Sequence, residues 1–373
     1  MKSLLLLPNA PSWYPGHMRR FFTQLPELLA RTHIILEARD LRLPLTSINP
    51  DFEAALERWR KSRSNGQSGM CERIVVYTKR DLMPSWGEEA SYASLSSHTK
   101  DWAEQSSYNL LVIGMPNVGK STLLNALRWV DVEGGRFSLR FNTTSVNKKS
   151  PAAKALQTSP LPGLTRTTST PLKLHTEPPI YSVDTPGVMV PFLGRGDEGK
   201  ERAMKLALTA GMKESLFDAE LMCSYLLHRL YLLNPRAPAY MSVLPREIAQ
   251  PNNAEEFLYA LTRRLGALQK GGLPDLERAE RWFIHWWRNG GSVSTPSPFG
   301  WGLDFDFTPL LVGGALPPTK DQAEKLIERI VDDYVASISS EEGVNRLSLR
   351  QEKKAAREAK IKARAQRRSG VSE

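Results

Sequence analysis

The sequence predicts an α/β fold, a mainly parallel sheet with helices on both faces, followed by an all-α domain. Two observations support this. Up to about residue 198, short apolar runs alternate with amphipathic stretches, and each run ends at a polar loop. Beyond residue 199 the apolar residues recur at helical spacing. We therefore expect a sheet-containing domain over 1–198, a helical domain over 199–314, and a helix with a basic tail over 315–373.

Four short apolar runs, rich in Val, Ile or Leu, are the expected strands: HIILEA, RIVVYT, NLLVIG and IYSVD. Helices are expected before, between and after them, at HMRRFFTQLPELLART, at Asp51–Arg60 and at TLLNALRWV. Sheets covered on both faces bind ligands at the carboxyl ends of their parallel strands. The loops after these runs are therefore the expected place of a site.

The C-terminal half is predicted to hold two helices within Lys200–Leu233 and three more at EEFLYALTRRLGAL, PDLERAERWFIHWWRNG and Asp321–Ser337. Four aromatic residues in RWFIHWWRN recur at helical spacing, namely Trp282, Phe283, Trp286 and Trp287. That spacing favours packing in the core. Stacking on RNA bases is the alternative.

Composition bounds the class of protein and its partners. The 373 residues carry a formal net charge of +10, and the only cysteines are Cys71 and Cys223. Two distant cysteines exclude a disulfide framework, make a zinc site unexpected and favour a reducing compartment. No apolar run reaches the ~20 residues of a transmembrane helix. The tail Arg350–Arg368 has nine Lys/Arg against two Glu. We expect it to contact RNA or an anionic membrane, with a solvated helix as the alternative.

The stretch Gly114–Ser121, GMPNVGKS, matches the phosphate-binding pattern GxxxxGK[ST] and lies between an expected strand and an expected helix. Its glycines allow backbone N–H groups to approach phosphate oxygens. The Lys120 ammonium is expected to reach the β- and γ-phosphates, and the Ser121 hydroxyl to bind Mg²⁺. The expected nucleotide-binding residues here are Asn117, Val118, Gly119, Lys120, Ser121 and Thr122.

Two further motifs follow this loop. Asp184, in Asp184–Gly187, closes the run IYSVD and is expected to hold Mg²⁺, while the Gly187 N–H faces the γ-phosphate. Thr165, in PGLTRTT, is the expected third Mg²⁺ ligand in the triphosphate state. A solvated polar loop is the alternative for Thr165.

The run RIVVYT ends in Thr78-Lys79-Arg80-Asp81. The Asp81 carboxylate can accept hydrogen bonds from both N1–H and the N2 amine of guanine, a pair that adenine lacks. The Lys79 stem can lie across the base, and Thr78 stands where Asn is more usual. Together with the phosphate loop, this tetrapeptide favours GTP over ATP.

The order of these motifs, with TKRD before GMPNVGKS, resembles that of the circularly permuted GTPases, which implies a P-loop GTPase fold. WYPGHM, Trp13–Met18, resembles the N-terminal signature of the YlqF/RbgA family of ribosome-assembly GTPases. Leu36–Pro50 resembles its DAR-P-S-NP segment, with Glu37 where Asp is usual. KLALT and KGGLPDLERA resemble parts of its helical domain, so the resemblance spans roughly residues 12 to 290.

The resemblance carries implications for the site. Val188, an apolar residue, follows the DTPG motif where many GTPases place a Gln that positions water. The family's candidate for that role is His17, so the implied catalytic residues are His17, Lys120 and Thr165. A structural loop histidine is the alternative for His17. The family also implies Asn117 as a ligand of K⁺, with an ordinary P-loop residue as the alternative.

The additional loops and basic tail resemble the mitochondrial ribosome-associated GTPases of eukaryotes. The function implied is GTP binding and Mg²⁺-dependent hydrolysis, stimulated by the large ribosomal subunit, in assembly of that subunit in the mitochondrial matrix or at the inner membrane. The large subunit and its rRNA are the expected partners. The rivals are a non-hydrolysing RNA-binding scaffold, against which the intact Lys120, Ser121 and Asp184 argue, and a membrane-surface regulatory GTPase.

Overall fold

The structure of the chain is a computed structural model. It describes residues 15–64, 72–84, 108–127, 171–176, 179–189, 193–194, 196–310 and 317–341, together with Leu7 and Arg357. Thr165, Trp13, Tyr14 and all but Arg357 of the basic tail lie outside the described residues.

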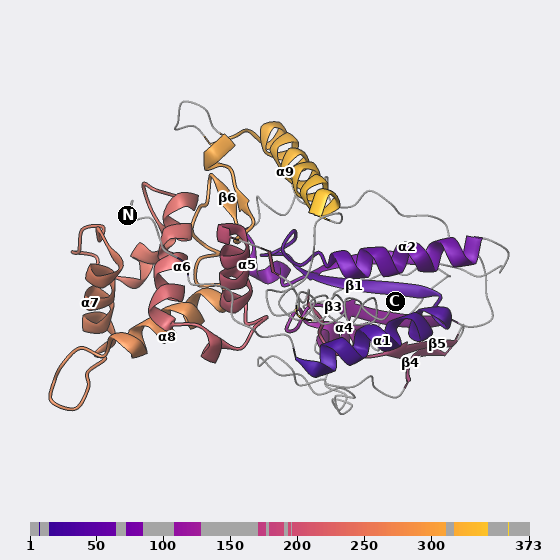
Figure 1. Cartoon of the computed structure of the whole chain (residues 1–373). Helices are drawn as coiled ribbons and strands as arrows, with labels where there is room; N and C mark the ends of the chain where they lie inside the picture. The colour runs from indigo at the N-terminus through magenta and orange to yellow at the C-terminus, as the bar shows by residue number, and fades with distance from the viewer. Residues whose placement is uncertain are drawn as a thin grey trace, which may run out of the picture.

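A five-stranded sheet forms the centre of the N-terminal part, in the order β2-β1-β3-β5-β4 (Figure 1). The four predicted strands are confirmed as β1 (Ile34–Asp40), β2 (Glu72–Thr78), β3 (Tyr108–Gly114) and β5 (Pro179–Val183), all in parallel pairs. The sequence did not reveal β4 (Leu172–Thr176), which pairs antiparallel with β5 at the edge. Its two leucines alternate with Lys173 and His175, a short pattern typical of a half-covered edge strand.

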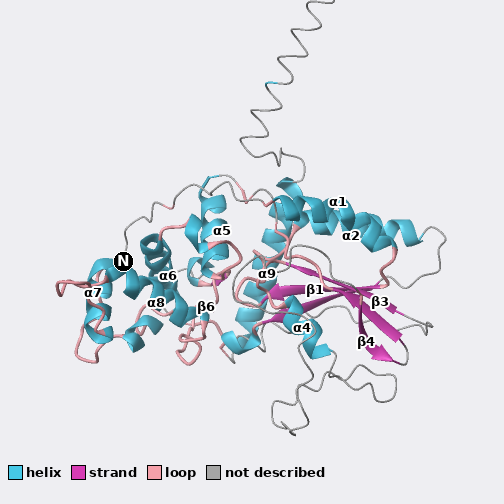
Figure 2. Ribbon diagram, turned by 90° about the horizontal axis from the view of Figure 1, so that it is seen from below, coloured by secondary structure: helices cyan, strands magenta, loops and turns pink. Residues whose placement is uncertain are grey.

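Helices cover both faces of this sheet. On one face lie α1 (Gly16–Ala30) and α2 (Pro50–Ser64), side by side in Figure 2. Phe21 and Phe52 from these helices share a buried cluster with Leu111 of β3. On the other face, Leu124 of α4 (Lys120–Leu127) packs against Val112 of β3. The predicted mainly parallel α/β architecture is confirmed.

The helical part consists of α5 (Gly196–Leu208), α6 (Ala219–Leu233), α7 (Ala254–Leu265) and α8 (Leu276–Arg288). It packs at the carboxyl edge of the sheet (Figure 1). One cluster joins these helices to Ala38 of β1 and to Met115 and Val118 of the loop after β3. Nothing in this shared core marks a boundary at 198/199, so that division stays a prediction.

The predicted core role of the aromatic run in α8 is confirmed for three residues and wrong for one. Phe283 and Trp287 are buried, and Trp286 stacks on Phe283 with ring centroids 5.4 Å apart. Trp282 is 38% exposed. Successive helical residues point about 100° apart, so a helix that buries 283 and 287 turns 282 toward its edge.

A small hairpin and a long helix follow α8. The hairpin pairs β6 (Gly300–Trp301) with β7 (Phe305–Asp306), and the helix is α9 (Lys320–Glu341). Trp301 and Phe305 form a buried cluster with Leu41, from the loop after β1, and with Ile327 of α9. The last helix is therefore packed on the N-terminal part, which its place in the sequence did not reveal.

Short 3₁₀ helices connect the larger elements, at Arg80–Leu82, Glu214–Leu216, Ala239–Val243 and Thr308–Leu310. Among the described residues, no helix is both long and apolar enough to cross a membrane.

Candidate nucleotide-binding site

The P-loop connects β3 to α4, as the sequence predicted. Gly114 lies so close to β1 that a Cβ there would stand 2.3 Å from the carbonyl oxygen of Ala38. The loop wraps around Lys120, whose ammonium donates hydrogen bonds to the carbonyls of Gly114 at 3.2 Å and Met115 at 2.7 Å. Burial lowers the pKa of Lys120 to about 8, against the opposing charge of Asp184. A phosphate at this position would favour the charged ammonium and raise this pKa.

Ser121 and Asp184, 63 residues apart in sequence, meet at this loop. The Ser121 hydroxyl donates a hydrogen bond of 2.8 Å to Asp184 Oδ2. Ser121 stands in the first turn of α4, and Asp184 follows β5, the parallel neighbour of β3. A hydroxyl and a carboxylate are the oxygen ligands that Mg²⁺ prefers. These two residues therefore fit the predicted Mg²⁺ site.

The segment after Asp184 lies directly on the P-loop. The Thr185 hydroxyl donates to the carbonyl of Val112 at 2.5 Å, and the Val188 N–H donates to the carbonyl of Gly114 at 3.1 Å. A Cβ on Gly187 would stand 2.4 Å from Cα of Pro116. Only glycine allows this approach, which brings the Gly187 backbone beside the phosphate loop as predicted.

Val188 packs against α1, the helix that carries His17. The Val188 side chain is fully buried, in a cluster that includes Met18 and Phe21 of α1. It therefore packs into the core and, as an apolar side chain, cannot position water. His17 immediately precedes Met18 and is half-buried. The alternative of a loop histidine is wrong in one respect, because α1 begins at Gly16 and places His17 in its first turn.

The tetrapeptide TKRD follows β2 at the same edge of the sheet as the P-loop. Because β1 lies between β2 and β3, the two loops are separated by one strand although their order in sequence is reversed. Lys79 adopts a left-handed conformation (φ 60°), and Asp81 is exposed in the short helix that follows. The Thr78 hydroxyl donates to the carbonyl of Arg39 at 3.0 Å, so it fixes the neighbouring strand.

A buried ion pair lies beside the tetrapeptide. The Arg42 guanidinium donates to Asp40 at 2.7 and 3.0 Å, and its charge holds the pKa of Asp40 below its usual value although burial acts to raise it. Burial lowers the pKa of Lys79, and the positive charges of Arg42 and Arg288 act in the same direction. The charges of Asp40 and Asp81 oppose that shift.

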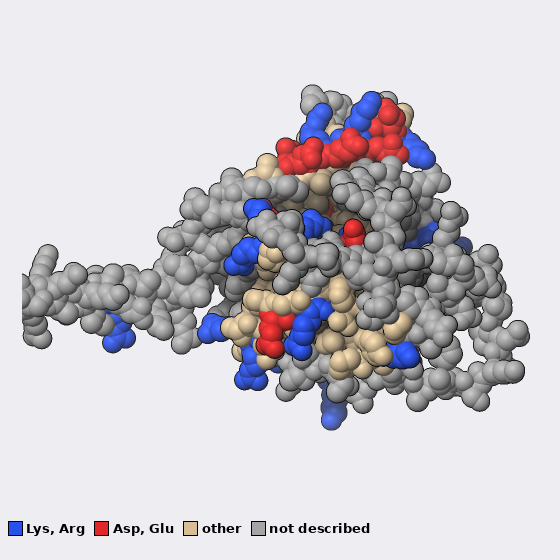
Figure 3. Space-filling view, turned by 90° about the vertical axis from the view of Figure 1, so that its right-hand side faces the viewer, with Lys and Arg blue, Asp and Glu red and all other residues tan. Residues whose placement is uncertain are grey.

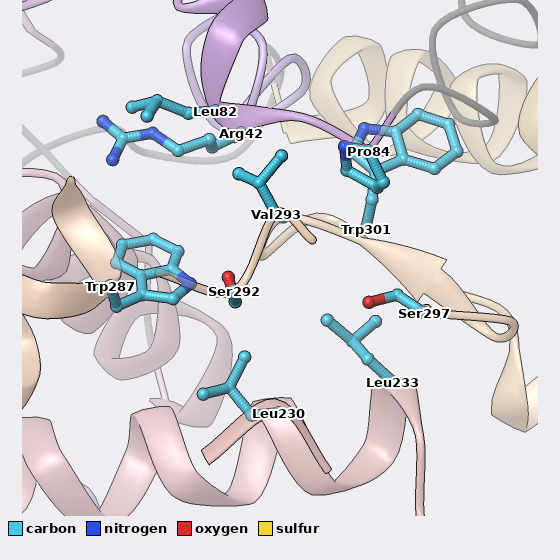
Figure 4. Close-up of a pocket in the computed structure, with 11 residues that line it drawn as sticks. Arg42, Leu82, Pro84, Leu230, Leu233, Trp287, Ser292, Val293, Ser297 and Trp301 are labelled. Carbon is cyan, nitrogen blue, oxygen red and sulfur yellow. The ribbon is translucent and has the colours of Figure 1, made fainter. Parts of the chain in front are cut away.

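Arg42 also borders a pocket between the helical part and the loop that carries Thr78-Lys79-Arg80-Asp81, here called the base loop (Figure 4). Its guanidinium lies over the Trp287 ring, 5.3 Å from the centroid. Leu82 and Trp301 contribute to the wall, whereas no P-loop residue does. The pocket thus adjoins the candidate base site without being the phosphate site.

Three connections at this edge were missed from the sequence. Asp304, in the β6–β7 turn, accepts hydrogen bonds from the N–H groups of Leu45 and Thr46 at 3.0 and 2.8 Å. Asn117 donates from its side-chain amide to the carbonyl of Ala210 at 2.8 Å. Arg288 donates to the carbonyl of Leu208 at 2.6 Å. The first joins residues 259 positions apart, and no local pattern signals such a pair.

Known proteins resemble this chain over most of its length. Residues 109–224 match a family model described as 50S ribosome-binding GTPase. "Mitochondrial GTPase 1" of Schizosaccharomyces japonicus is 26% identical over 326 residues, which cover 75% of this chain and 87% of that protein. "Mitochondrial ribosome-associated GTPase 1" of Xenopus tropicalis is 28% identical over 253 residues, 60% of this chain and 70% of that protein.

Two solved structures also align with the chain. The GDP-bound YlqF structure is 18% identical and covers 74% of this chain and 97% of its own, with a TM-score of 0.43. GNP-bound YlqF from T. maritima is 20% identical, with coverages of 74% and 96% and a TM-score of 0.42. The chain thus resembles the 50S ribosome-binding GTPases over residues 109–224 and the mitochondrial GTPases over as much as 75% of its length.

Proposed function

We propose that the chain binds GTP and hydrolyses it to GDP and phosphate, in support of assembly of the large subunit of the mitochondrial ribosome. The observation that carries the catalytic half is the 2.8 Å contact between Ser121 and Asp184, beside the buried ammonium of Lys120. A degenerate nucleotide fold has no reason to keep a hydroxyl, a carboxylate and a lysine together at a P-loop.

In this proposal the site residues bind the base, the phosphates, Mg²⁺ and the attacking water. Asp81 and Lys79 hold the guanine base, and Lys120 stabilises charge on the β- and γ-phosphates. Ser121, Asp184 and Thr165 hold Mg²⁺, which neutralises charge on the phosphate oxygens when it is bound. His17 positions the attacking water, because the Val188 side chain is buried in the core.

The proposal also includes a K⁺ ion and a ribosomal partner. The side-chain amide nitrogen of Asn117 donates a hydrogen bond to Ala210. In this proposal, the side-chain oxygen of Asn117, Oδ1, is the atom that contacts K⁺. A ribosomal partner agrees with the description of the matched family and with a net charge of +10, since rRNA is an acidic surface. The names of the relatives place them in mitochondria and, for one, at the ribosome.

Turnover of GTP with and without purified mitochondrial large subunits tests the proposal. We expect slow hydrolysis by the protein alone and faster hydrolysis with the large subunit, and no stimulation by the small subunit. Ser121→Ala should abolish the stimulated rate, because it removes the hydroxyl of the Ser121–Asp184 pair. Stoichiometric GTP binding without turnover under all conditions would instead indicate a scaffold. Binding to anionic vesicles in preference to subunits would indicate a membrane-surface GTPase.

A further inference from the structure

The connection between α7 and α8, residues 266–275, forms a finger that projects from the helical part (Figure 1). Its base is held at both ends. Gly266 ends α7 in a left-handed conformation, and Asp275 caps α8 by accepting a hydrogen bond of 3.0 Å from the Arg278 N–H. Between them, the Asp275 N–H donates to the carbonyl of the fully buried Ala267 at 2.9 Å. Both ends of the finger are therefore fixed to α7 and α8 by hydrogen bonds.

The tip of the finger is ordered as well. The Gln269 N–H donates to the carbonyl of Leu273 at 2.8 Å, and the Gly272 N–H donates to the carbonyl of Gln269 at 3.0 Å. Gly271 and Gly272 have φ values of 98° and 82°, which glycine adopts without strain. These contacts fold the chain back on itself, so the surface that the finger presents exists before any partner binds.

Two leucines flank this tip and face solvent. Leu268 is 59% exposed and Leu273 is 65% exposed, more than any other large apolar residue in the described part of the chain. An exposed leucine in a flexible loop can turn inward, but a hydrogen-bonded finger holds both outward. Paired apolar residues on an ordered projection are typical of a contact surface.

The net charge around the finger is positive, because four cations, at 263, 264, 270 and 278, outnumber the acidic Asp275 and Glu277. Lys270 is at the tip, and Arg263 and Arg278 stand on the adjacent turns of α7 and α8, all three exposed. Among the described residues, none of the three forms an ion pair. Arg264 adds a fourth cation, anchored by a 2.8 Å hydrogen bond to the carbonyl of Ser242. A basic surface attracts phosphate and repels basic proteins, so it favours RNA over ribosomal protein as the occupant.

Negative charge is concentrated on α9, away from the finger. Acidic side chains outnumber basic ones along α9, whose exposed acids include Asp321, Glu328 and Asp333. Figure 3 shows a band of acidic side chains, with basic ones beside them, on the upper rim of that face. Such a face repels RNA. In Figure 1, α9 and the finger lie at different ends of the molecule. A single RNA partner can therefore contact the finger while α9 faces away from it.

From these observations we infer that the finger formed by residues 266–275 is an RNA-contacting element, in which Lys270, Arg263 and Arg278 bind phosphates and Leu268 and Leu273 pack on exposed bases or sugars. This inference rests on the proposed function for the identity of the RNA, the rRNA of the large subunit. Unpaired nucleotides suit the leucines, because bases in a duplex present no apolar face.

The test uses the full-length protein and protein-free large-subunit rRNA. The variant Leu268→Ser/Leu273→Ser should bind this rRNA about tenfold more weakly, and Lys270→Ala should reduce the salt dependence of binding by about one phosphate contact. Leu216→Ser and Arg329→Ala are the matched controls, an exposed leucine of the short helix after α5 and an exposed cation of α9. Both controls should bind as the wild type does. GDP affinity and melting temperature should not change in any variant.

Photo-crosslinking followed by peptide mapping gives a second readout, and we expect cross-linked nucleotides on a peptide that contains 266–275. The inference would be overturned if the leucine variant bound protein-free rRNA with wild-type affinity. If that variant lost binding only to intact subunits, the finger would instead contact a ribosomal protein. GTP turnover tests the proposed function separately. A cross-linked finger in a protein that never hydrolyses GTP would uphold the inference and refute the GTPase.

Discussion

The P-loop residue Asn117 is hydrogen-bonded through its side-chain amide to the carbonyl oxygen of Ala210, in the turn that follows α5, at 2.8 Å. Both residues adopt left-handed conformations, with φ of 59° and 57°. The nucleotide loop thus touches the helical part directly. A shift of the P-loop on binding or hydrolysis would be passed to the end of α5.

Replacement of Asn117 tests this contact. Asn117→Gly keeps a residue that tolerates the left-handed conformation but removes the amide, whereas Asn117→Ala adds a backbone cost of about 1 kcal/mol. We expect wild-type hydrogen exchange at Leu206–Met212 to respond to GDP and the response to disappear in both variants. Asn117→Ala should also lower the free energy of unfolding. A normal response to GDP in Asn117→Gly would show that the contact does not couple the two parts.

Asp304 provides a second link, from the hairpin to the loop after β1. Its carboxylate accepts hydrogen bonds from Leu45 and Thr46 and pairs with Lys205 at 3.3 Å. The preceding residue, Leu303, donates to the carbonyl of Arg42 at 3.0 Å. Arg42 pairs with Asp40, and both charges act on Lys79. The hairpin therefore supports the base loop.

We expect Asp304→Asn to lower the free energy of unfolding by about 1–3 kcal/mol, because an amide offers a donor where the carboxylate accepted several hydrogen bonds. Guanine-nucleotide affinity should fall as well. Asp306→Asn is the control, since Asp306 pairs with Arg229 of α6, away from the base loop. It should lower stability and leave affinity for GDP in the remaining folded protein unchanged. Equal affinity in both variants would limit Asp304 to a structural role.

The pKa of Lys120 predicts a proton uptake on nucleotide binding. Its folded-state value of about 8 lies below the usual 10.5, so the folded protein binds fewer protons than the unfolded chain between these values. The stability cost of the buried charge is therefore present at neutral pH and disappears as the pH rises from 8 toward 10.5. Phosphate favours the ammonium and should raise this pKa.

Calorimetry of GDP binding in buffers of different ionisation enthalpy measures that uptake. At pH 8.5 we expect a partial proton per nucleotide, and at pH 7 little from this group. GDP affinity should also weaken as the pH rises above 8. Lys120→Arg, which stays charged throughout this range, should show no uptake at pH 8.5. An uptake that is the same in the wild type and in this variant would assign the proton to another group.

What the sequence could predict follows from how local each signal is. The strand, glycine-rich loop and helix around Lys120 lie within one continuous segment, so the P-loop was predictable. The Ser121–Asp184 contact followed from parallel strands, which bring distant loops to one edge. By contrast, the hairpin strands are only two residues long, and no period can reveal them. Asp304 reads in sequence as an ordinary turn residue, and its partners are known only once the fold is known.

Asp81→Asn should reduce the preference for guanine. The carboxylate accepts from two donors on the base, whereas an amide presents its own donor to one of them. The lost interaction is worth on the order of 1.5–3 kcal/mol. Competition of labelled GTP by GTP, ATP and XTP measures it, and we expect XTP, which offers an acceptor at C2, to compete better with the variant. Arg80→Asn is the neighbouring control. Unchanged selectivity in Asp81→Asn would remove TKRD from the base site.

His17→Ala should slow GTP turnover while leaving GTP affinity nearly unchanged. Val188 is buried in a cluster that includes Met18, so its side chain cannot orient water at the phosphate. Phosphoryl transfer depends on the position of that water. His17 lies next to Met18 in the first turn of α1, and Met18 shares a buried cluster with Val188. If His17 acts only once a partner completes the site, the large subunit would stimulate hydrolysis.

Single-turnover hydrolysis on the large subunit decides the role of His17. Positioned proton-transfer groups contribute about 10²–10⁴-fold, and an orienting group contributes less. We expect His17→Ala to lose most of the stimulation, and His17→Gln, which keeps a polar group able to bind water, to recover part of it. His33→Ala is the control, because the His33 ring nitrogen accepts from the Asn109 N–H at the opposite end of the sheet. Full stimulation of His17→Ala would leave the histidine as a structural residue of α1, and the water-positioning group would then have to come from the ribosome.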